Sequence, residues 1–263
     1  MRKEIRKGCT SYNVIVIVCF SFIFLLLRAI FLLENSIVPR EKLVQFDTSI
    51  PLIWIGGIPR SGTTLMRTML DAHDSVRCGE ETHVIPRILG LHSNILSSNT
   101  SYARYKEAGV TRQVLLNATA AYLLNIISMH GEPAPRLCNK DPFTLSSIDI
   151  VIEMFPQSKF IFMIRDGRAT AHSIISRKVS ISGFDIKTYD GCLRDWNKAI
   201  TRMHEKCKMA GATYCLPVHY EQLVLHPKAE MKRILEFLGL TWSDNVLHHQ
   251  DFIDKAGGVS LSK

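Results

Sequence analysis

The residues best suited to chemistry lie in one stretch, residues 53–81, which reads IWIGGIPRSGTTLMRTMLDAHDSVRCGEE. It begins with an apolar run typical of a buried strand, breaks at Gly56-Gly57, and takes on helical spacing near Ser61. A glycine-containing loop between a strand and a helix directs free backbone N–H groups and the positive end of the helix dipole at one point. The stretch therefore predicts a site for a phosphate-like anion.

The spacing within this loop narrows the class of ligand. Gly57 and Gly62 bracket four residues, and Thr63-Thr64 follow where a nucleotide triphosphatase has Lys and then Ser or Thr. The cation is instead Arg60, inside the loop, and the sequence carries no sign of a Mg²⁺ site. The pattern favours a phosphate-containing donor held without the usual lysine. An ordinary strand, turn and helix with a Gly-rich turn is the alternative interpretation.

A second polar segment, RDGR at 165–168, follows another apolar run, 159–164. Ser173 and Arg177 are four residues apart, so a helix after this segment would carry both on one face. Two arginines and a hydroxyl at the end of a strand suit a second phosphate. Taken alone, the segment is more simply explained as a charged helix start in which its Asp pairs with its second Arg.

A third segment, LCNKDP at 137–142, places Lys140 beside a cysteine in a tight stretch of chain. Taken alone, it is more simply explained as a surface lysine at the start of a helix.

The elements that must position these residues alternate along the chain. Helical patterns cover 110–129, 144–154, 168–178, 190–207 and 228–238, and strand patterns cover 52–55, 159–164 and 214–220. Asp190 is the expected N-cap of the long fourth helix. Alternating strands and helices predict an α/β fold, a parallel sheet flanked by helices, with ligands at the carboxyl ends of the strands.

The first fifty residues differ from the rest. Four basic residues among the first seven precede an apolar run at 12–33, which only Arg28 interrupts. The run is long enough to span a bilayer, and no small-x-small pattern follows it, so we expect an uncleaved anchor rather than a signal peptide. The basic residues predict a single-pass type II topology. The expected organisation is a cytoplasmic tail at 1–11, a transmembrane signal-anchor at 12–33, a lumenal stem at 34–50 and a catalytic domain at 51–263.

Composition excludes one class of partner. The net charge of the 263 residues is +8, and four of the positive charges belong to the tail. The remaining excess is diffuse, without a Lys/Arg run or an aromatic platform, which argues against nucleic-acid binding. It suits an acidic substrate.

Cysteines and sequons agree with a secretory location. Five of the seven cysteines fall in the predicted lumenal domain, where they are free to pair. Cys207 and Cys215 flank a short segment that a disulfide could close. The sequons at Asn99 and Asn117 predict glycosylation sites, although Asn117 lies within a helical pattern.

Taken together, these segments resemble the protein-tyrosine sulfotransferases. The resemblance runs from about residue 51 to residue 263 through IPRSGTTLMR, CGEET, EAGVT, LCNKDPF, IRDGRA, ISRKV, GFD, WNKAI, PVHYEQLVLHP and GGVSLSK, in that order. It implies a P-loop-like sulfotransferase fold, 3′-phosphoadenosine 5′-phosphosulfate (PAPS) as the sulfuryl donor, and no metal. The implied acceptors are tyrosines in acidic stretches of secretory or membrane proteins. The implied setting is a membrane-anchored homodimer in the Golgi apparatus.

The resemblance also assigns roles to residues. The 5′-phosphosulfate is held by Arg60, Ser61, Gly62, Thr63 and Thr64, and the 3′-phosphate side of the nucleotide by Arg165, Ser173, Arg177 and Tyr220. Glu81 is the general base, and Glu80 is the adjacent candidate that spacing alone does not separate from it. Lys140 and Arg60 stabilise charge on the sulfuryl group and the leaving phosphate. The peptide-binding residues are His83, Val84, Ile85, Pro86, Arg87 and Arg104. The implied disulfides are Cys78–Cys138 and Cys207–Cys215, with Cys192 free.

Two departures from the family pattern stand out. His83 replaces an expected arginine, which makes one positive charge near the substrate dependent on pH. The family also continues beyond GGVSLSK, into a part that carries a transition-state serine, so we expect a short or C-terminally truncated member. Two alternatives stay open. One is a P-loop kinase-like transferase, which Thr63 disfavours, and the other is a weak or silent Golgi paralogue that binds peptide or dimerises with a full-length enzyme.

Overall fold

The computed structural model describes residues 21, 23–26, 28, 48–129 and 131–253. The chain divides into two units, residues 1–45 and residues 46–263. In the first unit the described residues are helical and exposed. No helix among the described residues is long and apolar enough to cross a membrane. The predicted tail, most of the predicted transmembrane segment and most of the predicted stem lie outside the described residues.

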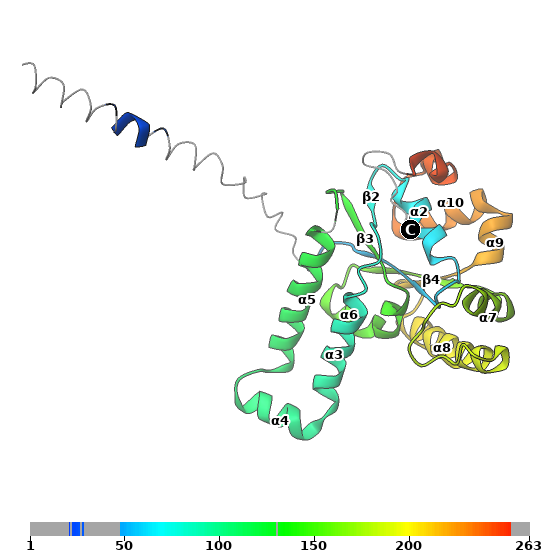
Figure 1. Ribbon diagram of the computed structural model, residues 1–263, viewed down its shortest axis with the longest axis horizontal. Helices are drawn as coiled ribbons and strands as arrows, with labels where there is room; N and C mark the ends of the chain where they lie inside the picture. Colours follow the sequence, from blue (N-terminus) through cyan, green and yellow to red (C-terminus); the bar gives the residue numbers. More distant parts are fainter. Residues whose placement is uncertain (1–20, 22, 27, 29–47, 130, 254–263) are drawn as a thin grey trace, which may run out of the picture. The chain divides into compact units, whose positions relative to one another are not determined.

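The second unit is built on a parallel sheet of five strands in the order β2-β3-β1-β4-β5 (Figure 1). The strands are β1 (Ile53–Gly57), β2 (Val76–Arg77), β3 (Arg136–Lys140), β4 (Lys159–Ile164) and β5 (Cys215–His219). The central strand β1 pairs with β3 on one side and β4 on the other, with Ile55 opposite both Lys140 and Ile161. The chain thus changes direction across the sheet beside β1, and such a switch point is where open α/β sheets bind ligands.

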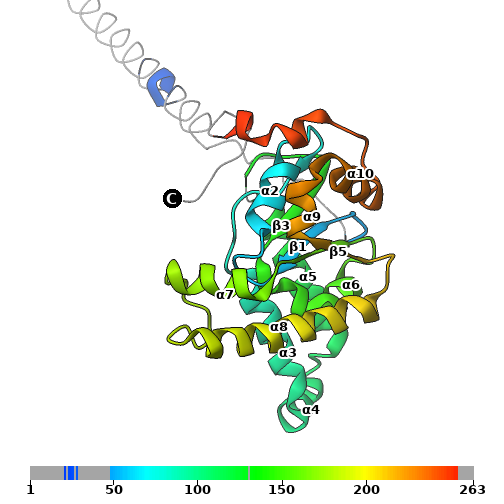
Figure 2. The ribbon, with the colours of Figure 1, turned by 90° about the vertical axis from the view of Figure 1, so that its right-hand side faces the viewer.

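Helices cover both faces of the sheet (Figure 2). The α-helices of this unit are α2 (Thr63–Asp71), α3 (Ile85–Ser97), α4 (Asn99–Glu107), α5 (Arg112–Met129), α6 (Ile148–Met154), α7 (Gly167–Ser176), α8 (Tyr189–Ala210), α9 (Tyr220–Leu225) and α10 (Pro227–Leu238). Three 3₁₀ turns are η1 (Pro142–Ser147), η2 (Asp244–Leu247) and η3 (His249–Phe252). Since side chains alternate along a strand, Trp54 and Phe160 pack against α5, α6 and α8, while Ile55 and Ile161 pack against α2 and α10.

Several predicted elements are confirmed. The strand at 159–164 is β4, and the helix that was predicted at 228–238 is α10, which ends at Gly239 in the left-handed conformation with φ 66°. The predicted strand at 214–220 ends one residue early, because Tyr220 already begins α9. The predicted helix at 144–154 is instead the 3₁₀ turn η1 followed by the short helix α6.

The prediction that Asp190 caps the long helix is wrong. The N-cap of α8 is Thr188, whose hydroxyl accepts a hydrogen bond from the Gly191 N–H at 3.1 Å. Thr188 has the extended backbone that an N-cap needs, whereas Asp190 lies within the first turn and pairs with Arg194. An acidic residue is also stabilising in that turn, which is why the sequence alone did not separate the two.

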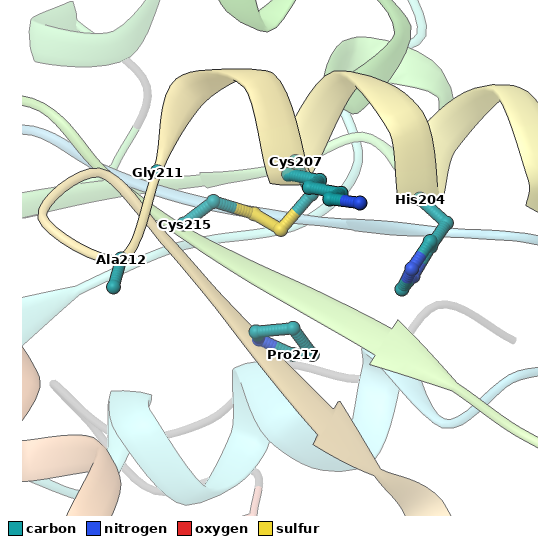
Figure 3. Close-up of a pocket in the computed structure, with 7 residues that line it drawn as sticks. His204, Cys207, Gly211, Ala212, Cys215 and Pro217 are labelled. Atoms are coloured by element: carbon teal, nitrogen blue, oxygen red, sulfur yellow. A yellow bond between two sulfur atoms is a disulfide. The ribbon is translucent and has the colours of Figure 1, made fainter.

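Both predicted disulfides are present, and the buried Cys192 is free. Cys78–Cys138 joins the segment after β2 to β3, and Cys207–Cys215 joins the end of α8 to the start of β5 (Figure 3). The hollow of about 280 Å³ beside the second disulfide lies at the amino end of β5. It is therefore at the opposite end of the strands from the predicted ligand edge.

The two disulfides should stabilise the fold to different extents. On the chain-entropy model, Cys78–Cys138 spans 60 residues and contributes about 4 kcal/mol, whereas Cys207–Cys215 spans 8 residues and contributes roughly 2–3 kcal/mol. Urea unfolding of the Cys78→Ser/Cys138→Ser and Cys207→Ser/Cys215→Ser proteins measures the difference. Non-reducing peptide mapping that links Cys192 to one of these four cysteines would contradict the pairing.

Candidate active site

The loop between β1 and α2 has the geometry of an anion site. Gly62, the N-cap of α2, has φ 98° and provides no side-chain cap, so the first N–H groups of the helix point out of its end. A Cβ on Gly62 would lie 2.4 Å from the Tyr220 ring, so only glycine fits there. The buried Ser61 hydroxyl has no hydrogen-bond partner in the part of the chain that the structure describes. These orphan donors fit an incoming phosphate or sulfate group.

A second group of polar residues closes the other side of this loop. The Arg60 Nε donates to the Ser173 hydroxyl at 3.1 Å, and Arg165 donates to the Arg60 carbonyl oxygen at 2.9 Å. The Arg165 guanidinium also lies 4.7 Å from the centroid of the Tyr220 ring, a cation–π contact. Arg177 lies one helical turn after Ser173, with its N–H bonded to the Ser173 carbonyl. The structure thus brings the residues predicted for the two phosphate groups into one neighbourhood.

The simpler explanation of the segment at 165–168 is also correct for part of it. Asp166 caps α7 by accepting from the Arg168 and Ala169 N–H groups, and it pairs with Arg168 at 2.7 Å. Arg168 holds the pKa of Asp166 well below its usual range. Arg165 contacts the Arg60 loop instead, so the two arginines of the segment have different roles.

Glu81 and Lys140 form an ion pair at the carboxyl end of β3. The side chain of Lys140 is 5% exposed and that of Glu81 is 27% exposed. Burial lowers the pKa of Lys140, against the opposing effect of the Glu81 carboxylate. The second Glu81 oxygen lies 3.5 Å from Nδ1 of the exposed His83. Glu81 therefore has a cation on one side and a titratable ring on the other.

Asp141, which the sequence did not single out, holds the segment that carries Glu81. Its buried carboxylate accepts hydrogen bonds from the His83 N–H at 2.9 Å, from the Thr82 hydroxyl at 2.6 Å and from the Asn139 amide at 2.9 Å. Because Asp141 follows Lys140 directly, the same strand end positions both the cation and the base.

A buried ion pair on α2 also holds the segment that leads to Glu81. Asp71 accepts hydrogen bonds from the Cys78 N–H at 2.5 Å and the Gly79 N–H at 3.4 Å, and it pairs with Arg67 at 3.0 Å. Both side chains are almost fully buried, and burial raises the pKa of Asp71. The sequence offered no signal for this role, because Asp71 looks like an ordinary residue at a helix end.

Some of these groups line one cleft of about 510 Å³. Its lining residues do not include Lys140 or several of the predicted donor residues, namely Ser61, Gly62, Arg165, Ser173, Arg177 and Tyr220. Arg60, Thr63, Thr64, Glu81, His83, Pro86 and Arg87 lie along it, and the other lining residues include Phe143 and 179–182. Sequence reasoning identified the first set and missed the second. Glu80 is not among the lining residues, which favours Glu81 as the base.

The cleft also contains three possible metal ligands. Donor atoms of Glu81, His83 and Asp141 lie within 4.8 Å of one another. Glu81 is already paired with Lys140, and Asp141 already accepts three hydrogen bonds. A cation there would have to compete with the buried ammonium group of Lys140, so the geometry gives no support to a metal-dependent role.

Comparison with known proteins now adds to this geometry. Residues 51–244 match the sequence model of the sulfotransferase family. The chain belongs to the sulfotransferase family. It is 58% identical over 224 residues to the protein-tyrosine sulfotransferase of Drosophila melanogaster, covering 85% of this chain and 45% of that one. Protein-tyrosine sulfotransferase 2 of Gallus gallus is 57% identical over 233 residues, covering 85% of this chain and 63% of the relative.

Another relative supports the same family, and a solved structure supports the same fold. A putative protein-tyrosine sulfotransferase of Caenorhabditis briggsae is 43% identical over 202 residues, covering 77% of this chain and 70% of the relative. The sulfotransferase domain from the Synechococcus PCC 7002 olefin synthase superposes with a TM-score of 0.53 at 22% identity, covering 78% of each chain, and supports the sulfotransferase fold. The resemblance to protein-tyrosine sulfotransferases is thus confirmed. The chain spans about half to two thirds of the length of the first relatives.

Three residues that the family resemblance assigns to peptide binding, Val84, Ile85 and Arg104, are not among the residues that line the cleft. Ile85 is fully buried in the hydrophobic core, so its side chain does not face the cleft. Arg104 lies on α4, beyond the far end of α3 (Figure 1), and does not line the cleft. Thirteen residues of helix separate α4 from the Glu81 end of α3, a span of about 20 Å at 1.5 Å per residue.

Loss of the Asp71 carboxylate should loosen the segment before Glu81. Asp71→Ala leaves Arg67 buried without this partner, which costs on the order of 3–5 kcal/mol. The Arg67→Met/Asp71→Leu protein should recover much of that stability but not the hydrogen bonds to Cys78 and Gly79. Urea unfolding and amide hydrogen exchange of residues 78–83 measure the two effects separately. Unchanged exchange at Cys78 and Gly79 in the folded double variant would refute the positioning role.

Proposed function

We propose that this chain transfers a sulfuryl group from PAPS to the phenol oxygen of tyrosines in acidic peptide stretches. The observation that carries the proposal is the Glu81–Lys140 pair. Glu81 lines the same cleft as Arg60, Thr63 and Thr64 of the anion loop, and its carboxylate is paired with the buried ammonium group of Lys140. A transfer between an anionic donor and a weakly acidic hydroxyl requires a base and a cation side by side. The relatives of Drosophila melanogaster and Gallus gallus are protein-tyrosine sulfotransferases, which supports the same chemistry.

The residues of the two anion sites fit this donor. PAPS carries a 5′-phosphosulfate and a separate 3′-phosphate. The N-terminus of α2, Arg60 and the Ser61 hydroxyl, which has no partner among the described residues, suit the first group. Arg165, Ser173 and Arg177 suit the second, and Tyr220 lies between the two sets. Arg60 for one anion, and Arg165 with Arg177 for the other, support the proposal of two adjoining anion sites.

The reaction assigns each group at the cleft one task. A tyrosine phenol has a pKa of ~10, so its oxygen needs a base when it attacks sulfur. Glu81 takes the phenolic proton while the new O–S bond forms. The bond between sulfur and the bridging oxygen breaks, and its electron pair leaves with 3′-phosphoadenosine 5′-phosphate. Lys140 and Arg60 stabilise the charge on the sulfuryl oxygens and on the leaving phosphate.

Glu81→Gln should abolish transfer while leaving donor binding nearly intact, because an amide does not take the phenolic proton. We expect kcat to fall on the order of 10²–10⁴-fold. Glu80→Gln is the matched control and should retain transfer. Radiolabelled donor with an acidic tyrosine peptide measures transfer, and calorimetry with 3′-phosphoadenosine 5′-phosphate measures binding. Wild-type turnover in Glu81→Gln would refute the base, and peptide binding without any wild-type transfer would favour the silent paralogue.

The dependence of kcat on pH should reveal the loss of the Lys140 charge. Because burial lowers its pKa, Lys140 loses its charge, and transfer falls, at a lower pH than for an ordinary lysine. Lys140→Arg stays charged throughout, so the alkaline limb of kcat should move to higher pH. Lys228→Arg on α10 is the surface control. The same alkaline limb in Lys140→Arg and wild type would contradict the assignment.

The cellular setting is part of the proposal and rests on the sequence. We propose a single-pass type II protein of the Golgi membrane with a lumenal catalytic domain, acting as a homodimer on secretory and membrane proteins. Asn99 is exposed at the start of α4, whereas Thr119 of the other sequon is hydrogen-bonded to His92 and to the Leu115 carbonyl. Asn99 is therefore the better glycosylation site. Protease treatment of sealed microsomes should spare residues 51–263, and their digestion would refute the orientation.

A further inference from the structure

The cleft has a neighbouring hollow that the proposed chemistry does not use. This second hollow has a volume of about 260 Å³ and shares two lining residues, Phe143 and Ser182, with the cleft that contains Glu81. Apart from Ser146 of η1, its other lining residues come from the loop before α8 and from α8 itself, and they include Gly183, Phe184 and Met203. Because 179–182 line the first space and 182–184 the second, one loop connects them.

The charges around this hollow are mainly positive. Lys198 and Arg202 are four residues apart on α8, so they lie on the same face of the helix. The one acidic residue lining the hollow, Asp195, accepts a hydrogen bond from the Asp185 N–H at 2.9 Å and lies 3.5 Å from Lys198. No hydrogen bond or ion pair joins Arg202 to another residue in the described part of the chain. Arg202 therefore lines the hollow, and its charge has no partner among the described residues.

We propose that this hollow is a subsite for an acidic side chain of the peptide substrate, some residues away from the acceptor tyrosine. The proposal rests on the function proposed above and adds a specificity determinant to it. A guanidinium binds a carboxylate through two parallel hydrogen bonds. Lys198, one turn away on the same face, is paired with Asp195 and offsets its negative charge. Phe143 and Phe184 make part of the lining of the hollow apolar. A peptide whose tyrosine is at Glu81 reaches the hollow along residues 179–183.

A scan with single glutamates tests the proposal. Each peptide carries one tyrosine and one glutamate, placed one to six residues to either side, in an otherwise neutral sequence. For the wild-type full chain we expect kcat/KM to have a maximum at a glutamate position beyond the immediate neighbours of the tyrosine, on the order of fivefold to tenfold above the peptide without glutamate. In Lys198→Gln/Arg202→Gln that ratio should fall to about one.

The matched control is Lys228→Gln/Lys232→Gln on α10. It removes the same charge at the same spacing from a helix that lines neither hollow, so it should keep the maximum. If the wild-type scan is flat, or if Lys198→Gln/Arg202→Gln keeps the maximum, the subsite is wrong while tyrosine transfer stands. If no peptide is sulfated, the proposed function fails instead. In that case, fluorescence anisotropy of the same peptides measures their binding and tests the subsite separately. An affinity maximum that depends on Lys198 and Arg202 would support the subsite, and the absence of such a maximum would overturn it.

Discussion

Lys140 carries a positive charge on a side chain that is almost wholly out of water. An isolated buried charge is costly, so the surrounding structure has to provide a partner and hold that partner in place. Glu81 is the partner, but it belongs to a segment of irregular chain after β2. Asp141 fastens that segment from one side, Asp71 from another, and the Cys78–Cys138 disulfide ties it to the strand that carries Lys140. The positions of the base and the cation are therefore set by the same few contacts.

The donor loop depends on a different constraint, the stabilisation of backbone that has unusual torsion angles. Arg60 has φ 74° and Gly62 has φ 98°, and the Tyr220 ring packs where a side chain on Gly62 would be. Non-glycine residues at positive φ are uncommon, so the conformation of Arg60 has to be stabilised by its surroundings. Hydrogen bonds to Ser173 and from Arg165 supply that stabilisation. The two anion sites are thus coupled, because the arginine of the first is held by residues of the second.

Sequence reasoning succeeded where the signal was local. The anion loop, β4 and α10 are contiguous patterns, and the family motifs carried the two disulfides. It failed where the stabilising contact joins distant residues. Asp141 is an example, because it accepts a hydrogen bond from the N–H of His83, 58 residues earlier in the chain. It missed β3 because Asn139 and Lys140 are polar and buried, which hides the apolar run of a central strand. Ile85 is buried in the core although its neighbours are not, because successive residues on a helix point about 100° apart, and the sequence segment 83–87 did not distinguish its buried member from its exposed ones.

The balance of charge in the cleft follows from its two substrates. The proposed donor and the proposed acidic peptide are both anionic, so they repel each other when both bind in the cleft. Two carboxylates of the cleft are already compensated, Glu81 by Lys140 and Asp141 by its hydrogen bonds, which leaves Arg60 and Arg87 available. Arg60 has to serve the donor, and Arg87 alone offers little for a peptide with several acidic residues. A chain that binds two anions side by side needs further cations along the peptide, and Lys198 and Arg202 lie where the cleft continues.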